Sequence, residues 1–165
     1  MAEAWLSLGS NLEPIRNLEE ALASLRERFG PMLESGWYAS RAVGFEGPEF
    51  INLAVGIETS LARSALDAYL HELEARQGRD RTQPKLSSRT LDIDIVVFET
   101  HPEFGSLDRA RLREDLRHTF VLRPLVDIAP ELVPPDGDPR RLAQRWQELM
   151  AVERASVRRV TPGPS

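Results

Sequence analysis

The sequence predicts an α+β fold: a ferredoxin-like βαββαβ antiparallel sheet with helices packed on it, followed by a mostly helical C-terminal extension. Three observations support this prediction. Several segments have the alternating or β-branched pattern of strands, two segments between them repeat apolar residues at helical spacing, and the last third returns to helical spacing between proline-rich turns. The chain has no repeats and no long linker, so residues 1–165 are expected to form a single domain.

The first half of the chain is expected to hold one helix and its flanking strands. Ala2–Leu8 is apolar-rich and runs into the turn signal Gly9-Ser10-Asn11, as a strand would. Apolar residues then recur at helical spacing as far as Gly30, and Asn11 is expected to cap this helix. The other elements expected here are a strand over Met32–Ala39, a loop over Ser40–Glu49 and a strand over Phe50–Thr59.

The second half is expected to begin with a helix from Ser60 or Ala62 to Gly78. A polar loop over Arg79–Ser88 then leads into a strand over Leu91–Phe98. The later elements expected are a short charged helix over Leu107–Arg117, an apolar segment over Phe120–Leu125 ended by proline, at most one helical turn over Val126–Ala129, turns over Pro134–Pro139 and a helix over Arg140–Met150. Residues 152–165 are ambiguous, and an edge strand that includes Val157 and Val160 is one interpretation.

Composition excludes several classes of protein. The net charge of −5 disfavours nonspecific binding of nucleic acid or of a membrane surface. The absence of cysteine excludes disulfides, thiolate catalysis and cysteine-ligated zinc. Neither a signal-like N-terminus nor an apolar run of membrane-spanning length is present, so we expect a cytoplasmic protein.

The segment from Leu91 to Phe98 carries the strongest chemical signal. Strand side chains alternate, so Asp92 and Asp94 are expected on one face, with Ile93, Ile95 and Val97 on the other. Two carboxylates about 6.5–7 Å apart along a strand can hold Mg²⁺, which prefers oxygen ligands and keeps waters and phosphate oxygens. The alternative is a pair of surface acids on the polar face of an edge strand. Aspartate is depleted in strand interiors, which favours the functional interpretation.

Two neighbouring features fit a ligand that carries phosphate. Four cations, Arg79, Arg81, Lys85 and Arg89, lead directly into the aspartates, although a charge run is also typical of a solvated face. Asn52 is a polar amide in an otherwise apolar strand, and an edge-exposed asparagine is an equally open interpretation.

The motifs together resemble the 6-hydroxymethyl-7,8-dihydropterin pyrophosphokinase family. The specific part is Arg89-Thr90-Leu91-Asp92-Ile93-Asp94-Ile95. The resemblance extends, in order, over Leu8–Leu12, Phe50–Val55, Gln77–Arg79, Phe120–Leu125, Ala129–Leu132 and Pro135–Gly137. It implies transfer of pyrophosphate from ATP to the hydroxymethyl group of the pterin in folate biosynthesis, with release of AMP.

The resemblance also implies roles for individual residues. Asp92 and Asp94 match the pair that holds two Mg²⁺ ions on the ATP phosphates, and Asp94, Arg79 and Arg89 match catalytic positions. The remaining matches are ATP-binding positions at His71, Glu74, Arg79, Arg81, Arg89 and Ile95, and pterin-binding positions at Ser40, Val43, Phe50, Asn52 and Phe120. For Phe120, ordinary core packing is the alternative.

The chain departs from the family pattern in two places. Leu86 and Ser87-Ser88 replace a tryptophan and a small Gly-Pro-like pair ahead of Arg89. A Pro-His pair and an arginine usually precede the Phe-Val-Leu run, whereas here the basic residues of that region are Arg111, Arg113, Arg117 and His118. These four are group candidates for the ATP site.

Two other functions remain open from the sequence. One keeps the paired aspartates and two metals but assigns another nucleotide reaction, because ferredoxin-like sheets also carry nucleotidyl transfer and cyclisation. The other is a noncatalytic small-molecule sensor in which Asp92 and Asp94 are surface acids. The nucleotide product released in an assay distinguishes these functions. The oligomeric state cannot be read from the sequence.

Overall fold

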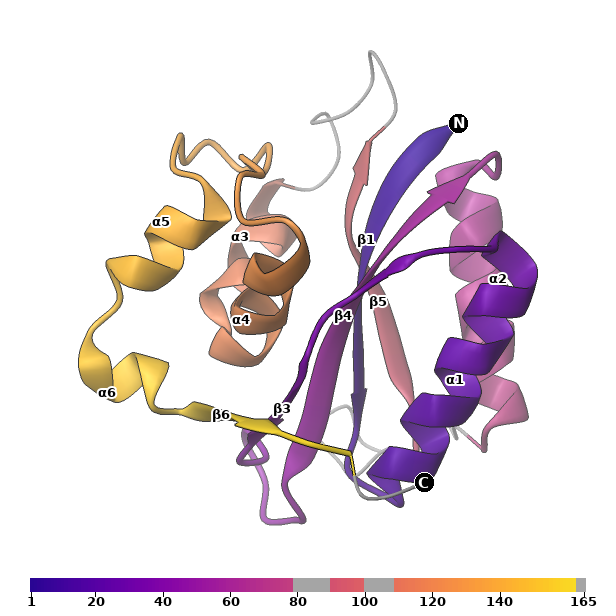
Figure 1. Ribbon diagram of the computed structural model, residues 1–165, viewed down its shortest axis with the longest axis horizontal. Coiled ribbons are helices and arrows are strands. Elements are labelled where there is room, and N and C mark those ends of the chain that lie inside the picture. The colour runs from indigo at the N-terminus through magenta and orange to yellow at the C-terminus, as the bar shows by residue number, and fades with distance from the viewer. Residues whose placement is uncertain (79–89, 100–108, 163–165) are drawn as a thin grey trace.

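A computed structural model describes residues 1–78, 90–99 and 109–162 of the chain. A single sheet runs through the molecule with helices on both sides (Figure 1). On one side lie α1 (Pro14–Phe29) and α2 (Arg63–Arg76). On the other lie α3 (Arg109–Arg117), α4 (Thr119–Ile128), α5 (Leu142–Gln147) and α6 (Ala151–Arg154).

The described residues form a six-stranded sheet in which every paired neighbour is antiparallel. Its order is β5-β1-β4-β3-β6, and the short β2 also pairs with β4. The strands are β1 (Ala2–Ser10), β2 (Leu33–Glu34), β3 (Trp37–Ser40), β4 (Phe50–Thr59), β5 (Asp92–Glu99) and β6 (Val157–Val160). The mixed architecture and antiparallel sheet agree with the sequence prediction. Strand β6 resolves the open question about Val157 and Val160.

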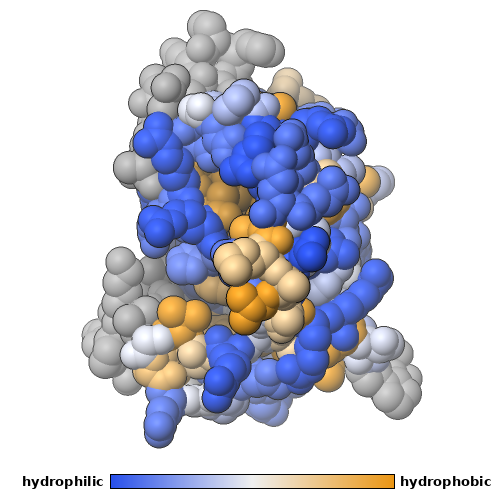
Figure 2. All heavy atoms as spheres, turned by 90° about the vertical axis from the view of Figure 1, so that its left-hand side faces the viewer, coloured by the Kyte–Doolittle hydropathy of each residue, from blue (hydrophilic) through white to orange (hydrophobic). Residues whose placement is uncertain are grey.

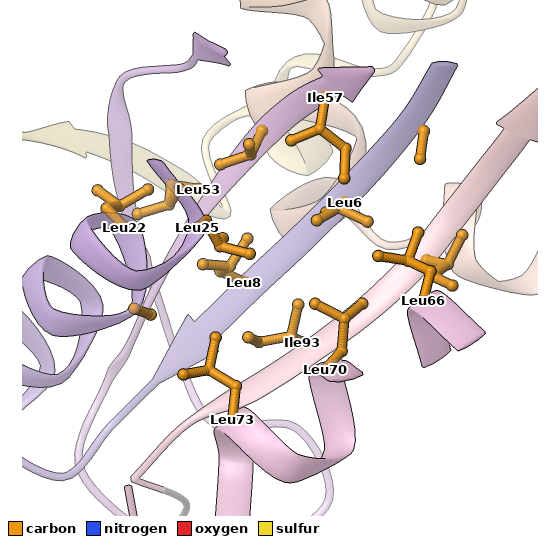
Figure 3. Packing of buried hydrophobic residues seen from close by; sticks show 14 of the residues in the cluster. Leu6, Leu8, Leu22, Leu25, Leu53, Ile57, Leu66, Leu70, Leu73 and Ile93 are labelled. Atoms are coloured by element: carbon orange, nitrogen blue, oxygen red, sulfur yellow. The ribbon is translucent and has the colours of Figure 1, made fainter. Parts of the chain in front are cut away.

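Each face of the sheet has its own apolar core. On the first face, Leu6 and Leu8 of β1 are fully buried among leucines of both helices (Figure 3), such as Leu25 of α1 and Leu70 of α2. On the second face the core contains Trp5 and residues of α3, α4 and α5, with Leu125 and Leu142 fully buried. The β4 and β1 strands are therefore covered on both faces, and β5 contributes side chains to both cores.

A β-bulge in β5 changes which way its last residues point. Trp5 is paired with Val97 while Leu6 is paired with Ile95, so Val96 is an extra residue in the ladder. Ile93 and Ile95 pack in the first core, as predicted, but Val97 packs in the second. The prediction that Val97 shares the face of Ile93 was therefore wrong, because strict alternation fails at a bulge.

Two local predictions near the first helices were also wrong. Asn11 does not cap α1: the cap position is Glu13, which has a left-handed backbone (φ 42°) and makes no capping hydrogen bond from its side chain. Asn11 is buried instead, and its Nδ2 donates to the carbonyl of Pro48 at 3.1 Å. The strand expected over Met32–Ala39 is split into β2 and β3, with Ser35 and Gly36 between them.

Helix α4 continues through Pro124, where the sequence predicted an end. Proline removes one helical hydrogen bond, but four apolar residues of this helix, Val121, Leu122, Pro124 and Leu125, are buried against the sheet side. Asp127 also fastens α4 to β3, accepting hydrogen bonds from the Tyr38 hydroxyl (2.8 Å) and the Gly36 N–H (3.0 Å). Burial, together with the hydrogen bond to Asp127, raises the pKa of Tyr38 to about 12. Tertiary packing thus overrides the local helix-breaking signal.

The outward side of α5 and α6 is largely hydrophilic, with an apolar strip across it (Figure 2). Met150 and Val152, both exposed, lie in this part of the chain. Among the helices that the structure describes, none has both the length and the apolar character required to cross a bilayer.

Candidate active site

Asp92 and Asp94 open strand β5 on the face that α3 covers. Their neighbours Ile93 and Ile95 are buried in the first core, so the two aspartates point the opposite way, and both are half-buried. Glu74 of α2, itself only 1% exposed, accepts a hydrogen bond through Oε2 from the N–H of Ile93 (3.1 Å). This contact fixes the backbone between the two carboxylates. The predicted pairing of Asp92 and Asp94 on one face is confirmed.

Register places Asp92 in line with Asn52 across the sheet. Gly9 of β1 is paired with Asp92 on one side and with Asn52 on the other, so the three residues share a face. Two strand spacings separate Asp92 from Asn52 by about 10 Å. A Cβ at Gly9 would lie 2.5 Å from Nδ2 of Asn52, so only glycine leaves this position open. The amide of Asn52 therefore reaches over Gly9, on the same face of the sheet as the carboxylates.

Asn52 and Ser40 each bury a polar atom without a partner. Oδ1 of Asn52 and Oγ of Ser40 have no hydrogen-bond partner within the described part of the chain, and both residues are 7% exposed. Among the described residues, Asn52 donates one long hydrogen bond, from Nδ2 to the Leu8 carbonyl (3.4 Å). Unpaired buried polar atoms are unfavourable, and a ligand with polar edges would satisfy them. Asn52 is not the edge-exposed asparagine that the sequence left open.

Aromatic rings lie at two of the predicted pterin positions. Phe50, two residues before Asn52 on the same face of β4, meets Phe45 edge-on with ring centroids 6.3 Å apart. Phe120 lies in the first turn of α4, and its ring stacks on that of His118 with centroids 4.8 Å apart and an interplanar angle of 20°. Val43 lies in the loop after β3 and is 54% exposed. Phe120 is partly buried beside the second core, so core packing accounts for part of its environment.

Of the four basic candidates from the segment before Phe120, the described contacts bring Arg111 to the aspartates. Its Nη2 lies 3.6 Å from Oδ1 of Asp94. Arg113 instead donates through Nε to the Asp136 carbonyl, and Arg117 contacts Glu114 at 3.4 Å. His118 is engaged with Phe120. The sequence could not separate these four, since only the rotation of α3 about its axis decides which one faces β5.

The predicted ATP-binding residues are spread over α2, β5 and the segment before β5. His71 is exposed on α2, 3.7 Å from Asp67, while Glu74 is buried against β5. The Ile95 side chain is buried in the first core, so its backbone is what remains for a ligand. Arg79, Arg81 and Arg89 lie outside the described residues.

The donors present fit magnesium better than a metal enclosed by protein. Across residues 1–78, 90–99 and 109–162, no cluster of three or more His, Cys, Asp or Glu side chains could hold a metal ion. Mg²⁺ does not need such a cluster, because it keeps several waters and is held by one or two carboxylates together with substrate phosphates. Asp92 and Asp94 meet that requirement, and Arg111 shows that the aspartates attract a cation.

A separate cavity of about 540 Å³ lies on the far side of α3, towards α5. Its charges are largely compensated within the protein: Arg145 pairs with Asp136 at 2.6 Å, and Arg140 pairs with Asp138 and Glu148. The hydrogen bond from Arg140 holds the pKa of Asp138 at about 2. Figure 2 shows this side of the molecule, where charged residues surround an apolar floor. The arrangement stabilises the turn after α4 and offers little unpaired charge to a ligand.

One residue of the site was missed by the sequence interpretation. Gly9 was assigned to a turn signal and to the Leu8–Leu12 segment of the family resemblance but was given no role in the site, whereas it is a β1 residue that separates Asp92 from Asn52. The signal was present in the run Leu8-Gly9-Ser10, but its meaning depends on the strand register, which a single sequence does not reveal.

Comparison with known proteins identifies related sequences. Residues 5–130 match the family model described as 7,8-dihydro-6-hydroxymethylpterin-pyrophosphokinase (HPPK). Two relatives are named 2-amino-4-hydroxy-6-hydroxymethyldihydropteridine pyrophosphokinase. The Synechocystis protein is 35% identical over 97% of this chain and 81% of its own length. The Pseudomonas aeruginosa protein is 36% identical over 81% of this chain and 84% of its own length.

Solved structures resemble the fold. An HPPK-DHPS crystal structure in complex with substrates superposes with a TM-score of 0.65 at 13% identity, covering 96% of this chain. A Plasmodium falciparum HPPK-DHPS with pterin and p-hydroxybenzoate gives 0.61 at 15% identity, also over 96% of this chain. The chain spans about half the length of each of these two proteins (48% and 47%). From the family match and these relatives, the chain belongs to the 7,8-dihydro-6-hydroxymethylpterin-pyrophosphokinase family.

Proposed function

We propose that the chain transfers the pyrophosphoryl group of ATP to the hydroxymethyl group of 6-hydroxymethyl-7,8-dihydropterin, releasing AMP, in folate biosynthesis. The observation that carries the proposal is the row formed by Asp92, Gly9 and Asn52. It places a pair of carboxylates suited to Mg²⁺ and phosphate beside a buried amide whose Oδ1 has no partner in the described residues. A triphosphate and a flat polar heterocycle are the two reactants that such a row would bring together.

Asp92 and Asp94 would hold two Mg²⁺ ions on the ATP phosphates. When bound, Mg²⁺ neutralises the charge that develops on the phosphate oxygens during transfer. Arg79 and Arg89 are proposed to contact the phosphates as guanidinium forks, and Arg81 is proposed to contribute to ATP binding. His71, Glu74 and the backbone of Ile95 complete the proposed ATP site. Because Glu74 holds the N–H of Ile93, its proposed contribution is to fix the strand that presents both aspartates.

The pterin would occupy the other half of the row. Asn52 would meet its donor and acceptor edge through the amide, and Ser40 would offer a buried hydroxyl two residue pairs along the ladder, opposite Phe50. Phe50 and Phe120 would contact the ring, since aromatic faces bind flat heteroaromatic rings well. Val43 would cover it from the loop after β3.

Pyrophosphoryl transfer needs positioning and charge stabilisation more than covalent chemistry. The sheet supplies the positioning, because Asp92, Gly9 and Asn52 are held by hydrogen-bonded strands and not by a loop. When Mg²⁺ and nucleotide bind, the Arg111 side chain is proposed to move away from Asp94. Its guanidinium would then contact the phosphates. Its separation from Asp94, 3.6 Å, is too long for a strong hydrogen bond and favours such a shift.

Several wider predictions belong to the same proposal. The order of the elements supports a ferredoxin-like βαββαβ unit in β1, α1, β3, β4, α2 and β5, with the α3–β6 part as its C-terminal extension. We propose that residues 1–165 act as a single pyrophosphokinase domain in the cytoplasm, without a nucleic-acid or membrane partner.

An assay of the nucleotide products tests the proposal. The protein is incubated with ATP, Mg²⁺ and 6-hydroxymethyl-7,8-dihydropterin, and the products are separated by ion-exchange chromatography. AMP in a one-to-one ratio with the pyrophosphorylated pterin is expected. Release of ADP or of free pyrophosphate would point to a different nucleotide reaction. Failure to bind the Mg²⁺–nucleotide complex at all would favour a noncatalytic sensor. EDTA should stop turnover, and added Mg²⁺ should restore it.

A further inference from the structure

The C-terminal strand β6 is joined to the loop over residues 41–49 by a two-pronged ion pair. Arg158 of β6 donates from Nη1 to Oε2 and from Nη2 to Oε1 of Glu49, both at 2.6 Å. Glu49 is the last residue of the loop, and 109 positions separate the partners in sequence. The hydrogen bonds from Arg158 lower the pKa of Glu49, so both partners are charged at neutral pH. Such paired geometry is the most specific form of an arginine–carboxylate contact.

Other contacts hold the same end of the loop in place. Ser40, just before the loop, is paired with Phe50 on one side and with Val157 of β6 on the other. The buried Asn11 donates to the carbonyl of Pro48. The two ends of the 41–49 loop are thus fastened to neighbouring strands, and the fastening on the β6 side consists of the β3–β6 ladder and the Glu49–Arg158 pair.

The loop reaches the proposed pterin site directly. Phe45 within it packs edge-on against Phe50, which shares its face of β4 with Asn52. Arg158 lies on the opposite face: it is paired with Ala39, which is in turn paired with Ile51. Because strand side chains alternate, Ala39 and Ile51 point away from Asn52 and Phe50. A change at Arg158 therefore leaves the residues that face the ligand untouched.

We infer that the Glu49–Arg158 pair positions the 41–49 loop over the pterin, which makes strand β6 a part of the substrate site. This inference depends on the proposed function, since it assumes that Asn52 and Phe50 bind the pterin. The pair fixes the loop before the ligand binds, so binding costs less conformational entropy in the loop. Arg158 is a positioning residue. Its loss is expected to weaken pterin binding and to leave Mg²⁺–ATP binding unchanged, because the described contacts of Asp92 and Asp94 do not involve the loop.

Calorimetric titration of Arg158→Gln tests the inference. The pterin and Mg²⁺–ATP are titrated separately into the wild type, Arg158→Gln, Glu49→Gln and the charge-exchanged double variant Glu49→Arg with Arg158→Glu. Each single variant is expected to raise the Kd of the pterin about two- to fivefold, the effect of losing one exposed ion pair. The Kd of Mg²⁺–ATP should stay at the wild-type value. The double variant is expected to recover most of the lost pterin affinity.

A control is Arg16→Gln, which removes the exposed ion pairs of Arg16 with Glu13 and Glu20 at the start of α1. It should change neither Kd. Unchanged pterin affinity in Arg158→Gln would overturn the inference, as would equal losses for both ligands accompanied by a lower Tm. A wild-type protein that binds Mg²⁺–ATP but does not bind the pterin even with Mg²⁺ and a non-hydrolysable ATP analogue present would contradict the proposed function itself, and this outcome can be told apart from the others.

Discussion

Arg111 reaches across from helix α3 to Asp94 of strand β5, its Nη2 lying 3.6 Å from the carboxylate Oδ1. Both side chains are about half exposed, so the pair is solvated and adds little to stability. The contact instead shows that the Arg111 guanidinium lies beside the proposed magnesium ligands. A guanidinium at this place can move to a phosphate oxygen without a change in the fold, because α3 also packs against β5 through the buried Leu112.

Replacing Arg111 with glutamine should weaken the use of ATP. We expect kcat/KM for ATP to fall about ten- to a hundredfold, since a charge-assisted hydrogen bond to phosphate contributes about 1.5–3 kcal/mol. Steady-state kinetics with varied ATP at saturating pterin measures this change. Arg117→Gln is the matched control, being an arginine of the same helix that is 78% exposed and contacts Glu114. Equal effects of the two substitutions would contradict the assignment of Arg111.

Asp94→Asn should abolish turnover while leaving the protein folded. The substitution keeps the shape of the side chain but removes the charge that would hold Mg²⁺, so kcat should fall at least about 1,000-fold. The Tm should change by little, because Asp94 is 46% exposed and its ion pair with Arg111 is solvated. Kinetics over a range of Mg²⁺ concentrations tests the effect, with Glu20→Gln on the exposed surface of α1 as control. Near-normal activity in Asp94→Asn would refute the metal assignment.

Gly9→Ala should disturb the pterin half of the site through Asn52. The added Cβ would lie 2.5 Å from Nδ2, so the amide has to turn away from its present position. Overpacking of this kind lowers the free energy of unfolding by about 1–3 kcal/mol. We expect at least about tenfold weaker pterin binding, corresponding to about 1.4 kcal/mol, with Mg²⁺–ATP binding retained.

A second substitution distinguishes the steric clash at residue 9 from the proposed binding of the pterin by Asn52. In Gly9→Ala combined with Asn52→Ala the clash is gone, so the Tm should recover, while pterin affinity should stay as low as in Asn52→Ala alone. Calorimetry and thermal unfolding of the three variants provide the comparison. Recovery of pterin affinity in the double variant would show that Asn52 does not bind the pterin.

The sequence predicted the elements whose signals are local. The apolar stripes of α1 and α2 and the alternation along β4 are determined by neighbours in the chain, and these elements were placed within a few residues of their observed ends. Asp92 and Asp94 were predicted on one face for the same reason, because two residues apart on a regular strand always share a face. The error at Val97 came from a bulge, which no local pattern in β5 announces.

What could not be predicted depends on contacts between distant segments. Pro124 indicates a helix end, yet α4 continues because the sheet buries its apolar side. The function of Gly9 needs the register of three strands, and the choice of Arg111 among four basic residues needs the orientation of α3. A family resemblance names the aligned positions, but Arg111 lies where this chain departs from the family pattern, so its position had to come from the structure.

The turn after α4 should give the protein an acid-sensitive contribution to stability. Hydrogen bonds from Arg140 hold the pKa of Asp138 at about 2, below its ordinary value of 3.8. Since the folded pKa lies below the unfolded one, the stabilisation is full above about pH 4 and is lost as the pH falls through about 2. Asp138 and Arg140 are partly exposed, so solvent screening reduces the effect to about 1 kcal/mol at pH 7.

Asp138→Asn is therefore expected to lower the free energy of unfolding by about 1 kcal/mol at pH 7, which corresponds to a Tm about 2–4 °C lower. The difference from the wild type should shrink between pH 4 and pH 2, because the wild type loses the same contribution there. Urea unfolding at a series of pH values measures this convergence. Glu20→Gln serves again as control. A difference that stayed constant down to pH 2 would mean that the Asp138 side chain acts by packing or by its shape, and that its charge contributes nothing.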